Sequence, residues 1–474
     1  MADPRARNRR PGGRPPARRA GPASDPSRSA AYDVLKAVRL DDAYTNLVLP
    51  HVLREHELTG RDAAFTTELV SGTIRRQGTY DAIIMACLDR PKVEAKVLDA
   101  LRLGAHQLLS MRVPAHAAIS TTVDLVRAKV GQGPAGFTNA VLRKVAAHDL
   151  AGWIRRVAPD PAQDPIGFAS LAHSHPRWVV GGLRDALGPD GDLDALLAAD
   201  NLPPKVMLVA RPGLCTPQEL LALGGTPGQW SPYAVQLEAG DPGVIPAVTD
   251  DRAGVQDEGS QLVALALARA PMAGRDERWL DLCAGPGGKS ALLAALARER
   301  GAKVLASELQ HHRAGLVARG TRQLSGGLLG VITADGTRPP WRPGSFDRIL
   351  LDAPCSGLGA LRRRPESRWR RTPGDVKDLV SLQHSLLSTA LDSVRHGGVV
   401  AYVTCSPLLA ETAEIVTSVL EERRDVELLD AGSALEAGTG LPVPDSDGPL
   451  PGTVQLWPHV HGTDAMFLAL LTRR

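Results

Sequence analysis

The sequence predicts a multidomain protein: an all-α domain over residues 30–148, a small α+β linker module over 149–250, and an α/β domain over 251–474. Apolar residues recur at three- and four-residue steps in the N-terminal part, whereas strand-like and helical stretches alternate in the C-terminal part. The length of 474 residues also suits about three domains of roughly 150 residues each.

Residues 1–29 are predicted to be a disordered Arg/Pro-rich tail. Residues 1–30 hold eight Arg and two Asp, a local charge of +6, whereas the whole chain carries +3, so the remaining residues carry −3. The tail is either an arm that binds phosphates or a solvated extension, and composition does not decide between them. With no apolar signal segment and no run of 18 apolar residues, we expect a cytoplasmic protein without a membrane span.

Helical periodicity runs over residues 30–148, beginning with Val34, Leu35 and Val38. Gly and Pro residues divide this stretch into roughly six helices, and no alternating strand pattern interrupts it. The next hundred residues are rich in Pro and Gly, with short β-like pieces such as Val206–Val209. They predict a small mixed module between two larger domains.

The pattern becomes α/β from about Gly254. Five strand-like segments follow, with helical patterns between most of them: Trp279–Cys283, Val304–Ser307, Leu328–Thr333, Asp347–Asp352 and Val399–Val403. This alternation predicts an open, largely parallel sheet covered by helices on both faces. Ligands bind to such sheets at the carboxyl ends of the strands, and the unusual clusters of this sequence follow these segments.

A glycine-rich loop, Asp281–Ser290, follows the first of these strands and leads into a helical stretch. Gly285, Gly287 and Gly288 would let a ligand approach the backbone while a helix N-terminus faces it. The phosphate-loop pattern of nucleotide hydrolases fails because Cys283 stands where it needs Gly, and the dinucleotide fingerprint fails because the loop ends in Ser. A loop that holds S-adenosylmethionine and a tight structural turn remain as interpretations.

Four acidic residues close four consecutive strands: Asp281, Glu308, Asp335 and Asp352. Glu308 could accept hydrogen bonds from two ribose hydroxyls, and Asp335 could meet an adenine amino group. Each acid alone could be a helix cap or a turn residue. Four of them at consecutive strand ends favour a bound nucleoside.

Two of the five cysteines, Cys355 and Cys405, come directly after strands in loops rich in Pro and Ser. A buried cysteine usually acts as a small hydrophobe, but these loop positions at the ligand edge favour chemistry. No two cysteines are spaced as Cys-x-x-Cys, so we expect free thiols and no metal site.

An arginine-rich run, Leu361–Arg371, begins six residues after Cys355 and holds six Arg, one Glu and one Trp. Such a run is usually a solvated loop, but its place beside the active loop favours single-stranded RNA, with Arg on phosphates and an aromatic ring for stacking. The RNA-binding candidates are Arg313, Arg362, Arg363, Arg364, Arg368, Trp369 and Arg370. For Arg313 a solvated helix face is an equal alternative.

These motifs together resemble the Sun/RsmB family of 16S ribosomal RNA cytosine-5 methyltransferases. The matching stretches are Asp281–Ser290, Asp352–Gly359 and Thr404–Ser406, supported by Val255–Gln261 and Leu361–Arg371. The helical domain resembles the NusB-like RNA-binding domain of this family, through Ala64–Thr73 and Gly136–Arg143. The resemblance covers residues 30–474 and implies a Rossmann-like class I methyltransferase domain at 251–474, acting as a monomer on small-subunit ribosomal RNA.

By this resemblance, Cys405 is the nucleophile that adds to carbon 6 of a cytosine and makes carbon 5 electron-rich enough to take a methyl group. Asp352 would hydrogen-bond the base, and Cys355 would act in product release. Enzymes that methylate cytosine in DNA use the Pro-Cys thiol instead, here Cys355, but the Thr404-Cys405-Ser motif favours the RNA arrangement. The target base must leave its stack to reach a thiol, so unpaired RNA is expected.

The resemblance also implies a set of residues for the cofactor, S-adenosylmethionine: Cys283, Ala284, Gly285, Pro286, Gly287, Gly288, Lys289, Glu308, Asp335 and Asp352. Lys289 could equally be an ordinary residue of the first helical turn. The chain departs from the family at Gly285, Thr412 and Ala465–Met466, where Ala, Asn and Gly-Phe are usual, and none of these touches the thiols. The alternative function is a non-catalytic RNA-binding protein with a degenerate methyltransferase fold.

Overall fold

The computed structural model describes residues 25–41, 43–90, 92–238 and 240–474. The described residues form two compact units: the first contains those of 25–41, 48–73 and 83–150, and the second contains those of 43–47, 74–82 and 151–474. The predicted tail lies outside the described residues over 1–24.

Helix α1 (Pro26–Leu40) begins four residues before the predicted start of the helical domain. The Asp25 carboxylate accepts a hydrogen bond from the Arg28 amide at 2.9 Å, and Pro26 occupies the first turn, where no amide donor is needed. The predicted tail is therefore wrong over residues 26–29, because the capping signal lies inside the Pro-rich stretch.

The all-helical character of this part of the chain is confirmed. In the described residues up to 145, six more helices follow α1: α2 (Thr45–Glu55), α3 (Gly60–Arg75), α4 (Gln77–Ala86), α5 (Ala95–Leu109), α6 (Ala115–Lys129) and α7 (Ala135–Val145). Val34 and Leu35 of α1 and Leu101 of α5 are buried, as the three- and four-residue spacing predicts.

The linker region contains both helices and a small sheet. The helices are α8 (Leu150–Val157), α9 (Pro165–His173), α10 (Arg177–Leu187), α11 (Leu193–Ala199), α12 (Pro217–Leu221) and α13 (Pro246–Thr249). The strands are β1 (Val206–Ala210), β2 (Thr226–Pro227), β3 (Ala234–Leu237) and β4 (Ala253–Val255), in the order β2-β3-β1-β4. Because β4 pairs with β1, this sheet extends past the predicted boundary at residue 250.

A larger, mostly parallel sheet carries the rest of the second unit, in the order β10-β12-β9-β8-β5-β6-β7 with β11 beside β12. Its strands are β5 (Arg278–Asp281), β6 (Lys303–Glu308), β7 (Leu328–Thr333), β8 (Phe346–Asp352), β9 (Val394–Thr404), β10 (Val426–Leu429), β11 (Val454–Gln455) and β12 (Phe467–Arg473). The five predicted strands form the parallel part, and the unpredicted β10, β11 and β12 add antiparallel pairs.

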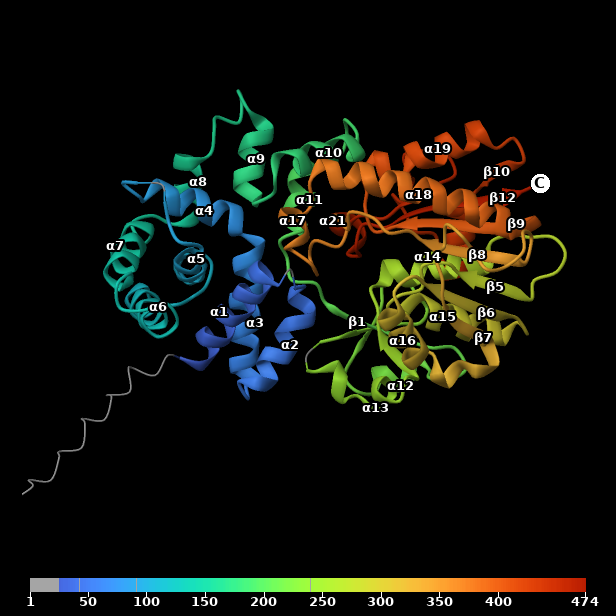
Figure 1. Ribbon diagram of the computed structural model, residues 1–474, viewed down its shortest axis with the longest axis horizontal. Coiled ribbons are helices and arrows are strands. Elements are labelled where there is room, and N and C mark those ends of the chain that lie inside the picture. The colour runs from blue at the N-terminus through green and yellow to red at the C-terminus, as the bar shows by residue number, and fades with distance from the viewer. Residues whose placement is uncertain (1–24, 42, 91, 239) are drawn as a thin grey trace, which may run out of the picture. The chain divides into compact units, whose positions relative to one another are not determined.

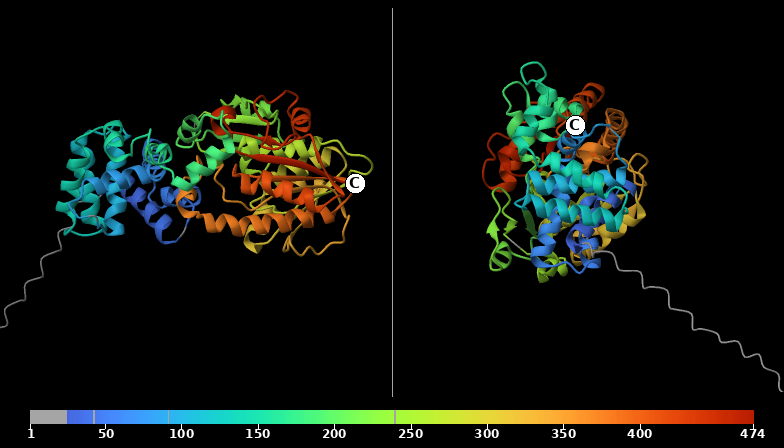
Figure 2. Two further views of the ribbon diagram at one scale, coloured as in Figure 1. Left: turned by 90° about the horizontal axis from the view of Figure 1, so that it is seen from above. Right: turned by 90° about the vertical axis from the view of Figure 1, so that its left-hand side faces the viewer.

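Helices cover both faces of the larger sheet, as predicted (Figure 1). On one face, α14 (Glu258–Arg269), α15 (Gly288–Glu299) and α20 (Ala431–Thr439) pack against it through a shared apolar core. On the other, α18 (Pro373–Ser393) and α19 (Ala413–Glu422) form a second core with the sheet, and α18 runs alongside the strands (Figure 2). Short helices α16 (His311–Gly320), α17 (Ser367–Arg370) and α21 (Pro458–His461) complete the unit.

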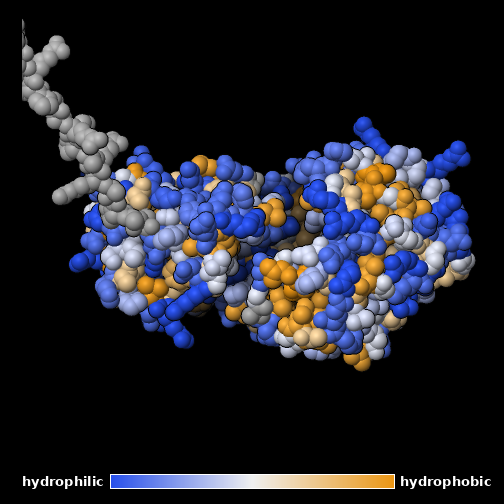
Figure 3. Space-filling model, turned by 90° about the horizontal axis from the view of Figure 1, so that it is seen from below, coloured by the Kyte–Doolittle hydropathy of each residue, from blue (hydrophilic) through white to orange (hydrophobic). Residues whose placement is uncertain are grey.

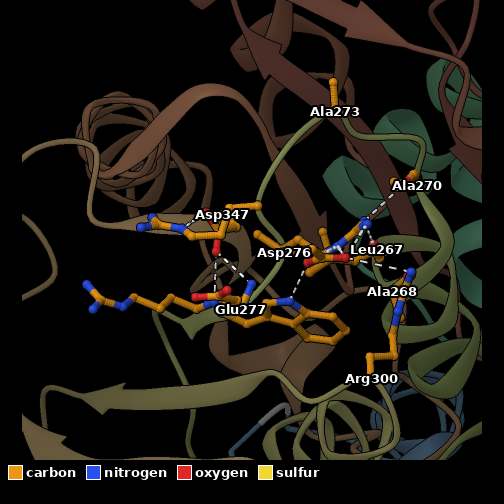
Figure 4. A network of polar contacts seen from close by, with 12 residues as sticks. Leu267, Ala268, Ala270, Ala273, Asp276, Glu277, Arg300 and Asp347 are labelled. Carbon is orange, nitrogen blue, oxygen red and sulfur yellow. Dashed lines mark hydrogen bonds and ion pairs between the residues drawn. The ribbon is translucent and has the colours of Figure 1, made fainter.

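A network of polar contacts around Asp347 and Asp276 ties the strands together at their amino ends (Figure 4). Asp347 at the start of β8 is fully buried and accepts the backbone amides of Glu277 and Arg278 at 2.8 Å, as well as the side chains of Arg275 and Arg395. Burial opposes the charge of this carboxylate, but these donors outweigh it and lower the pKa of Asp347. The carboxyl ends of the same strands are therefore left free for the site.

The surface drawn in Figure 3 is mostly hydrophilic, with separate apolar patches between the polar side chains. None of the helices in the described part of the chain combines the length and the apolar character that a bilayer span requires.

Gly359 joins the loop after β8 to the strands beside it. Its amide donates to the Cys405 carbonyl and its own carbonyl accepts the Ala465 amide, both at 2.8 Å. A Cβ at this position would lie 2.2 Å from the Ala465 carbonyl oxygen and 2.8 Å from that of Cys405. Both neighbours are backbone atoms, so neither can rotate away.

Gly359→Ala should therefore lower the free energy of unfolding by about 1–3 kcal/mol through overpacking, measured by urea denaturation of the whole chain. Gly181→Ala is the matched control, because a Cβ there meets nothing within 4 Å inside α10, and it should leave stability unchanged or raise it by about 0.4–1 kcal/mol. Equal stability of the two variants would contradict the packing argument.

Candidate active site

The two loop cysteines meet at the carboxyl edge of the sheet. Strands β8 and β9 are adjacent and parallel, and Asp352 stands opposite Val403, so the residues that follow them lie side by side. The sulfurs of Cys355 and Cys405 are 3.4 Å apart and both side chains are half-buried. The two cysteines are fifty positions apart in the sequence, and the strand order brings them into contact.

The contact shifts the pKa values of the two thiols in opposite directions. A hydrogen bond from Cys355 is the main cause that lowers the pKa of Cys405; burial and the Asp352 charge oppose it, and the charges of Lys289 and Arg364 add to it. The same bond, together with burial, raises the pKa of Cys355 well above its usual value. Cys405 is thus the thiol favoured as a thiolate, and Cys355 the thiol that keeps its proton.

Lys289 joins the thiols from the glycine-rich loop. Its Nζ lies 2.8 Å from the Asp352 carboxylate, which ends β8. Burial opposes the charge of this lysine, but the Asp352 carboxylate outweighs burial and the pKa of Lys289 is raised. Lys289 is therefore more than a first-turn helix residue: it places a buried ammonium group and a carboxylate beside the two sulfurs.

The glycine-rich loop closes over Glu308 at the end of β6. The Gly285 amide donates to the Glu308 carboxylate at 2.9 Å, and a Cβ on Gly285 would lie only 2.3 Å from the same carboxylate oxygen. Glycine at this position lets the loop and the carboxylate approach each other. Gly287, with φ of +115°, then turns the chain into α15.

Arg313, in the first turn of α16, contacts this loop and Glu308 with its half-exposed side chain. Its guanidinium donates to the Gly285 carbonyl at 2.6 Å and lies 3.5 Å from the Glu308 carboxylate. Arg313 thus supplies a counter-charge to Glu308 and holds the loop, and its contact with RNA stays a prediction.

The loop and its acids suit a nucleoside cofactor with an amino-acid group. Asp281 is fully buried, accepts the Ser290 hydroxyl at 2.5 Å, and keeps its Oδ1 without a partner in the described residues. Burial is the main cause that raises the pKa of Asp281 to about 7. An orphaned carboxylate oxygen, a glycine cradle and the N-terminus of α15 at one strand edge fit the polar groups of S-adenosylmethionine.

Asp335 and Cys283, two further predicted cofactor residues, also lie at the carboxyl edge of the sheet. The Asp335 carboxylate accepts the amide and the hydroxyl of Thr337 at 2.9 and 2.7 Å, which lowers the pKa of Asp335. It is a turn residue here, and its contact with adenine stays a prediction. Burial raises the pKa of the Cys283 thiol, so Cys283 supplies backbone rather than a reactive sulfur. Ala284 and Pro286 continue the loop.

Most of the arginine-rich run is structural, contrary to the RNA prediction. Arg362 and Arg363 lie close to the buried carboxylates Asp257 and Asp464, with 2.5 Å between Arg363 and Asp257. Arg368 is fully buried and donates to the Asn201 side chain at 2.9 Å and to nearby carbonyl oxygens. Buried carboxylates require cationic partners, and this run supplies them.

Trp369 also packs inward, because a Cβ on Gly78 would lie 2.3 Å from the edge of the indole ring. The exposed member of the predicted set is Arg364, whose guanidinium lies 5.2 Å from the centre of the Tyr44 ring. Arg370 lies 5.1 Å from the same ring and donates to the Ala43 carbonyl at 2.5 Å. Arg364 is thus the residue of this run that remains available for RNA.

Glu411 is the site residue that sequence reasoning did not select. It is fully buried and accepts hydrogen bonds from Ser356 and Ser406, the residues that follow the two cysteines. Its position five residues after Ser406 could have indicated a contact with that serine. Its hydrogen bonds with Ser356 could not be predicted, because they depend on the order of the strands.

Comparison with known proteins agrees with this geometry. Residues 268–472 match the family described as 16S rRNA methyltransferase RsmB/F, and residues 25–147 match the NusB family. A methyltransferase of Mycobacterium tuberculosis is 52% identical over 456 residues, covering 95% of this chain and 97% of that protein. Ribosomal RNA small subunit methyltransferase B of Pseudomonas putida is 34% identical over 430 residues, covering 88% of this chain and 93% of that protein.

Solved structures show the same fold. PH0851 superimposes with a TM-score of 0.76 at 20% identity, covering 96% of this chain and all of that chain. NSun6 from Pyrococcus horikoshii, solved with SFG, gives a TM-score of 0.53 at 15% identity, covering 63% of this chain and 98% of that chain. By its sequence relatives, its NusB region and its methyltransferase domain, the chain belongs to the RsmB family of ribosomal RNA small-subunit methyltransferases.

Proposed function

We propose that this ribosomal RNA methyltransferase modifies carbon 5 of a cytosine in 16S ribosomal RNA, through a transient covalent bond between Cys405 and carbon 6 of the base. The 3.4 Å contact between Cys355 and Cys405, beside the Lys289–Asp352 pair, carries this proposal. A methyl transfer to an oxygen or an exocyclic nitrogen would need no second thiol at this place. Since such a substrate is met in the bacterial cytoplasm, we propose that location as well.

In the first step, the Cys405 thiolate adds to carbon 6, and the electron pair of the 5,6 double bond moves into the ring. Asp352, held by Lys289, hydrogen-bonds the base edge, and a proton that the Lys289 ammonium group donates to Asp352 is shared with ring N3 as negative charge develops there. Carbon 5 thereby becomes nucleophilic. The glycine-rich loop, Glu308 and Asp281 would hold S-adenosylmethionine, which would supply the methyl group.

The second thiol then releases the product. Because the hydrogen bond to Cys405 is the main cause that raises the pKa of Cys355, consumption of the Cys405 thiolate removes that cause. Cys355 can now ionise, its own proton passes to solvent, and the resulting thiolate accepts the proton from carbon 5. The electrons of that C–H bond re-form the 5,6 double bond and expel Cys405 as a thiolate, which restores the starting state.

Cys405→Ala should reduce methyl transfer to 16S ribosomal RNA at least about a thousandfold, since the base is no longer activated. The measurement is transfer of labelled methyl groups from the cofactor, with the modified position mapped by bisulfite sequencing. Cys215→Ala, which removes a buried thiol of the small sheet, is the matched control and should keep its activity. Undiminished transfer by Cys405→Ala would refute the covalent mechanism.

Cys355→Ala should accumulate a protein–RNA adduct that survives denaturation, because carbon 5 keeps its proton and Cys405 cannot leave. Gel retardation in denaturant, in the presence of cofactor and RNA, detects this species. The adduct should disappear in the Cys355→Ala/Cys405→Ala double variant. A Cys355→Ala protein that turns over normally and forms no adduct would overturn the release role.

Arg364→Ala should weaken RNA binding and reduce the slope of log affinity against log salt by about one, the change expected for one lost phosphate contact. Binding of S-adenosylmethionine, measured by calorimetry, should not change. Arg184→Ala, which removes an exposed arginine paired with Asp185, is the control and should leave the salt slope unchanged. An unchanged slope in Arg364→Ala would exclude it from the RNA-binding surface.

A further inference from the structure

Glu411 connects the two cysteine loops through one buried carboxylate. One oxygen accepts the Ser356 amide at 2.7 Å and the Gln383 side-chain amide at 3.1 Å. The other accepts the hydroxyls of Ser356 and Ser406, each at 2.5 Å. The side chain is fully buried, so water does not compete for these bonds.

The geometry of these bonds calls for an acceptor without a proton. Four donors converge on two oxygens, and a carboxylate accepts all four, whereas an amide would present a second donor to the serine hydroxyls. The Ser356 hydroxyl also lies at hydrogen-bond distance, 3.0 Å, from the Ser406 hydroxyl oxygen, so the two serines contact each other as well as the carboxylate. Hydrogen bonds to a charged acceptor are short, and the three from the serines are 2.5–2.7 Å long.

Glu411 is itself held from two further elements. Gln383 of α18 donates to the Pro354 carbonyl at 2.8 Å as well as to Glu411, so it links the first cysteine loop again. Tyr402 of β9 donates to the Glu411 backbone carbonyl at 2.8 Å. The carboxylate therefore has a fixed position relative to both strands that carry the cysteines.

We propose that Glu411 is the positioning residue of the two-thiol centre: by fixing Ser356 and Ser406, it holds Cys355 and Cys405 in hydrogen-bond contact. This role rests on the proposed function only for its effect on catalysis. The contact itself is a property of the folded chain, since each serine is the next residue after its cysteine.

Loss of Glu411 should change the pKa of Cys405. Without Glu411, the loops relax, Cys355 no longer donates to Cys405, and the main cause that lowers the pKa of Cys405 is lost. The other charged groups that face the sulfur, Asp352, Lys289 and Arg364, stay in place. Loss of a negative charge alone would act in the opposite direction, so the sign of the shift separates positioning from electrostatics.

The test is the alkylation of Cys405 by iodoacetamide as a function of pH, read by mass spectrometry in the whole chain. Glu411→Gln should move the midpoint of Cys405 reactivity to higher pH, by about 0.5–1 unit, because a hydrogen bond to the thiolate is lost. Glu258→Gln is the matched control: Glu258 is also a buried carboxylate that accepts three backbone amides, and its variant should leave the midpoint unchanged.

In methyl transfer, Glu411→Gln should lower kcat about 10–100-fold, the usual effect of losing a residue that orients a reactive group. KM for RNA and the cofactor affinity should stay within about twofold of the original protein. Should Glu411→Gln fail to fold, Ser356→Ala and Ser406→Ala decide the question, and each should move the Cys405 midpoint in the same direction. An unchanged or lowered midpoint in the variants that fold overturns the positioning role.

The two proposals fail separately. If the Cys405 midpoint rises in Glu411→Gln while Cys405→Ala still methylates RNA, the positioning role stands and the covalent mechanism is wrong. If Cys405→Ala is inactive and the midpoint does not move, the covalent mechanism stands and Glu411 is only structural.

Discussion

The chemistry of this protein depends on two parallel strands that end side by side. Asp352 of β8 lies opposite Val403 of β9, so the loops that follow are neighbours whatever their own sequences prefer. A thiol needs another group within a few ångströms to change its proton affinity, and loops alone rarely provide such precision. Here the hydrogen bonds of the sheet provide this precision, because the register of β8 and β9 sets the positions of the two sulfurs.

The two edges of the sheet carry opposite electrostatic arrangements. At the amino ends, the buried carboxylate of Asp347 accepts two backbone amides and arginine side chains, and the half-buried Asp276 accepts the Trp279 indole and Arg348. At the carboxyl ends, Asp281 keeps an unpartnered oxygen, and Asp352 shares its charge with a single lysine. The polar groups at the amino edge thus have their hydrogen-bond partners within the protein, whereas polar groups without a full set of partners lie at the carboxyl edge, where a ligand binds.

Local patterns in the sequence were sufficient for the parallel strands and for the residues that end them. Each strand is a short apolar run followed by an acid or a cysteine, and both features lie within ten residues. The sequence did not predict the antiparallel strands β10 and β12, because a short apolar run such as Val426–Leu429 fits a strand or a helix equally well when its pairing partner is unknown. Likewise Arg363 and Arg368 look solvated in sequence, since the buried groups they bind, Asp464 and Asn201, lie more than a hundred positions away.

Strand order also determines when the centre can form during synthesis. Phe467 pairs with Thr404, the Ala465 amide binds the Gly359 carbonyl, and Asp464 holds Arg363, so β12 anchors the cysteine loops although it follows them in the chain. A ribosome halted between residues 411 and 464 carries both thiols and the glycine-rich loop but not the strand that seats them. The bonds that hold the cysteine loops from this side therefore form last, after almost the whole chain has been synthesised.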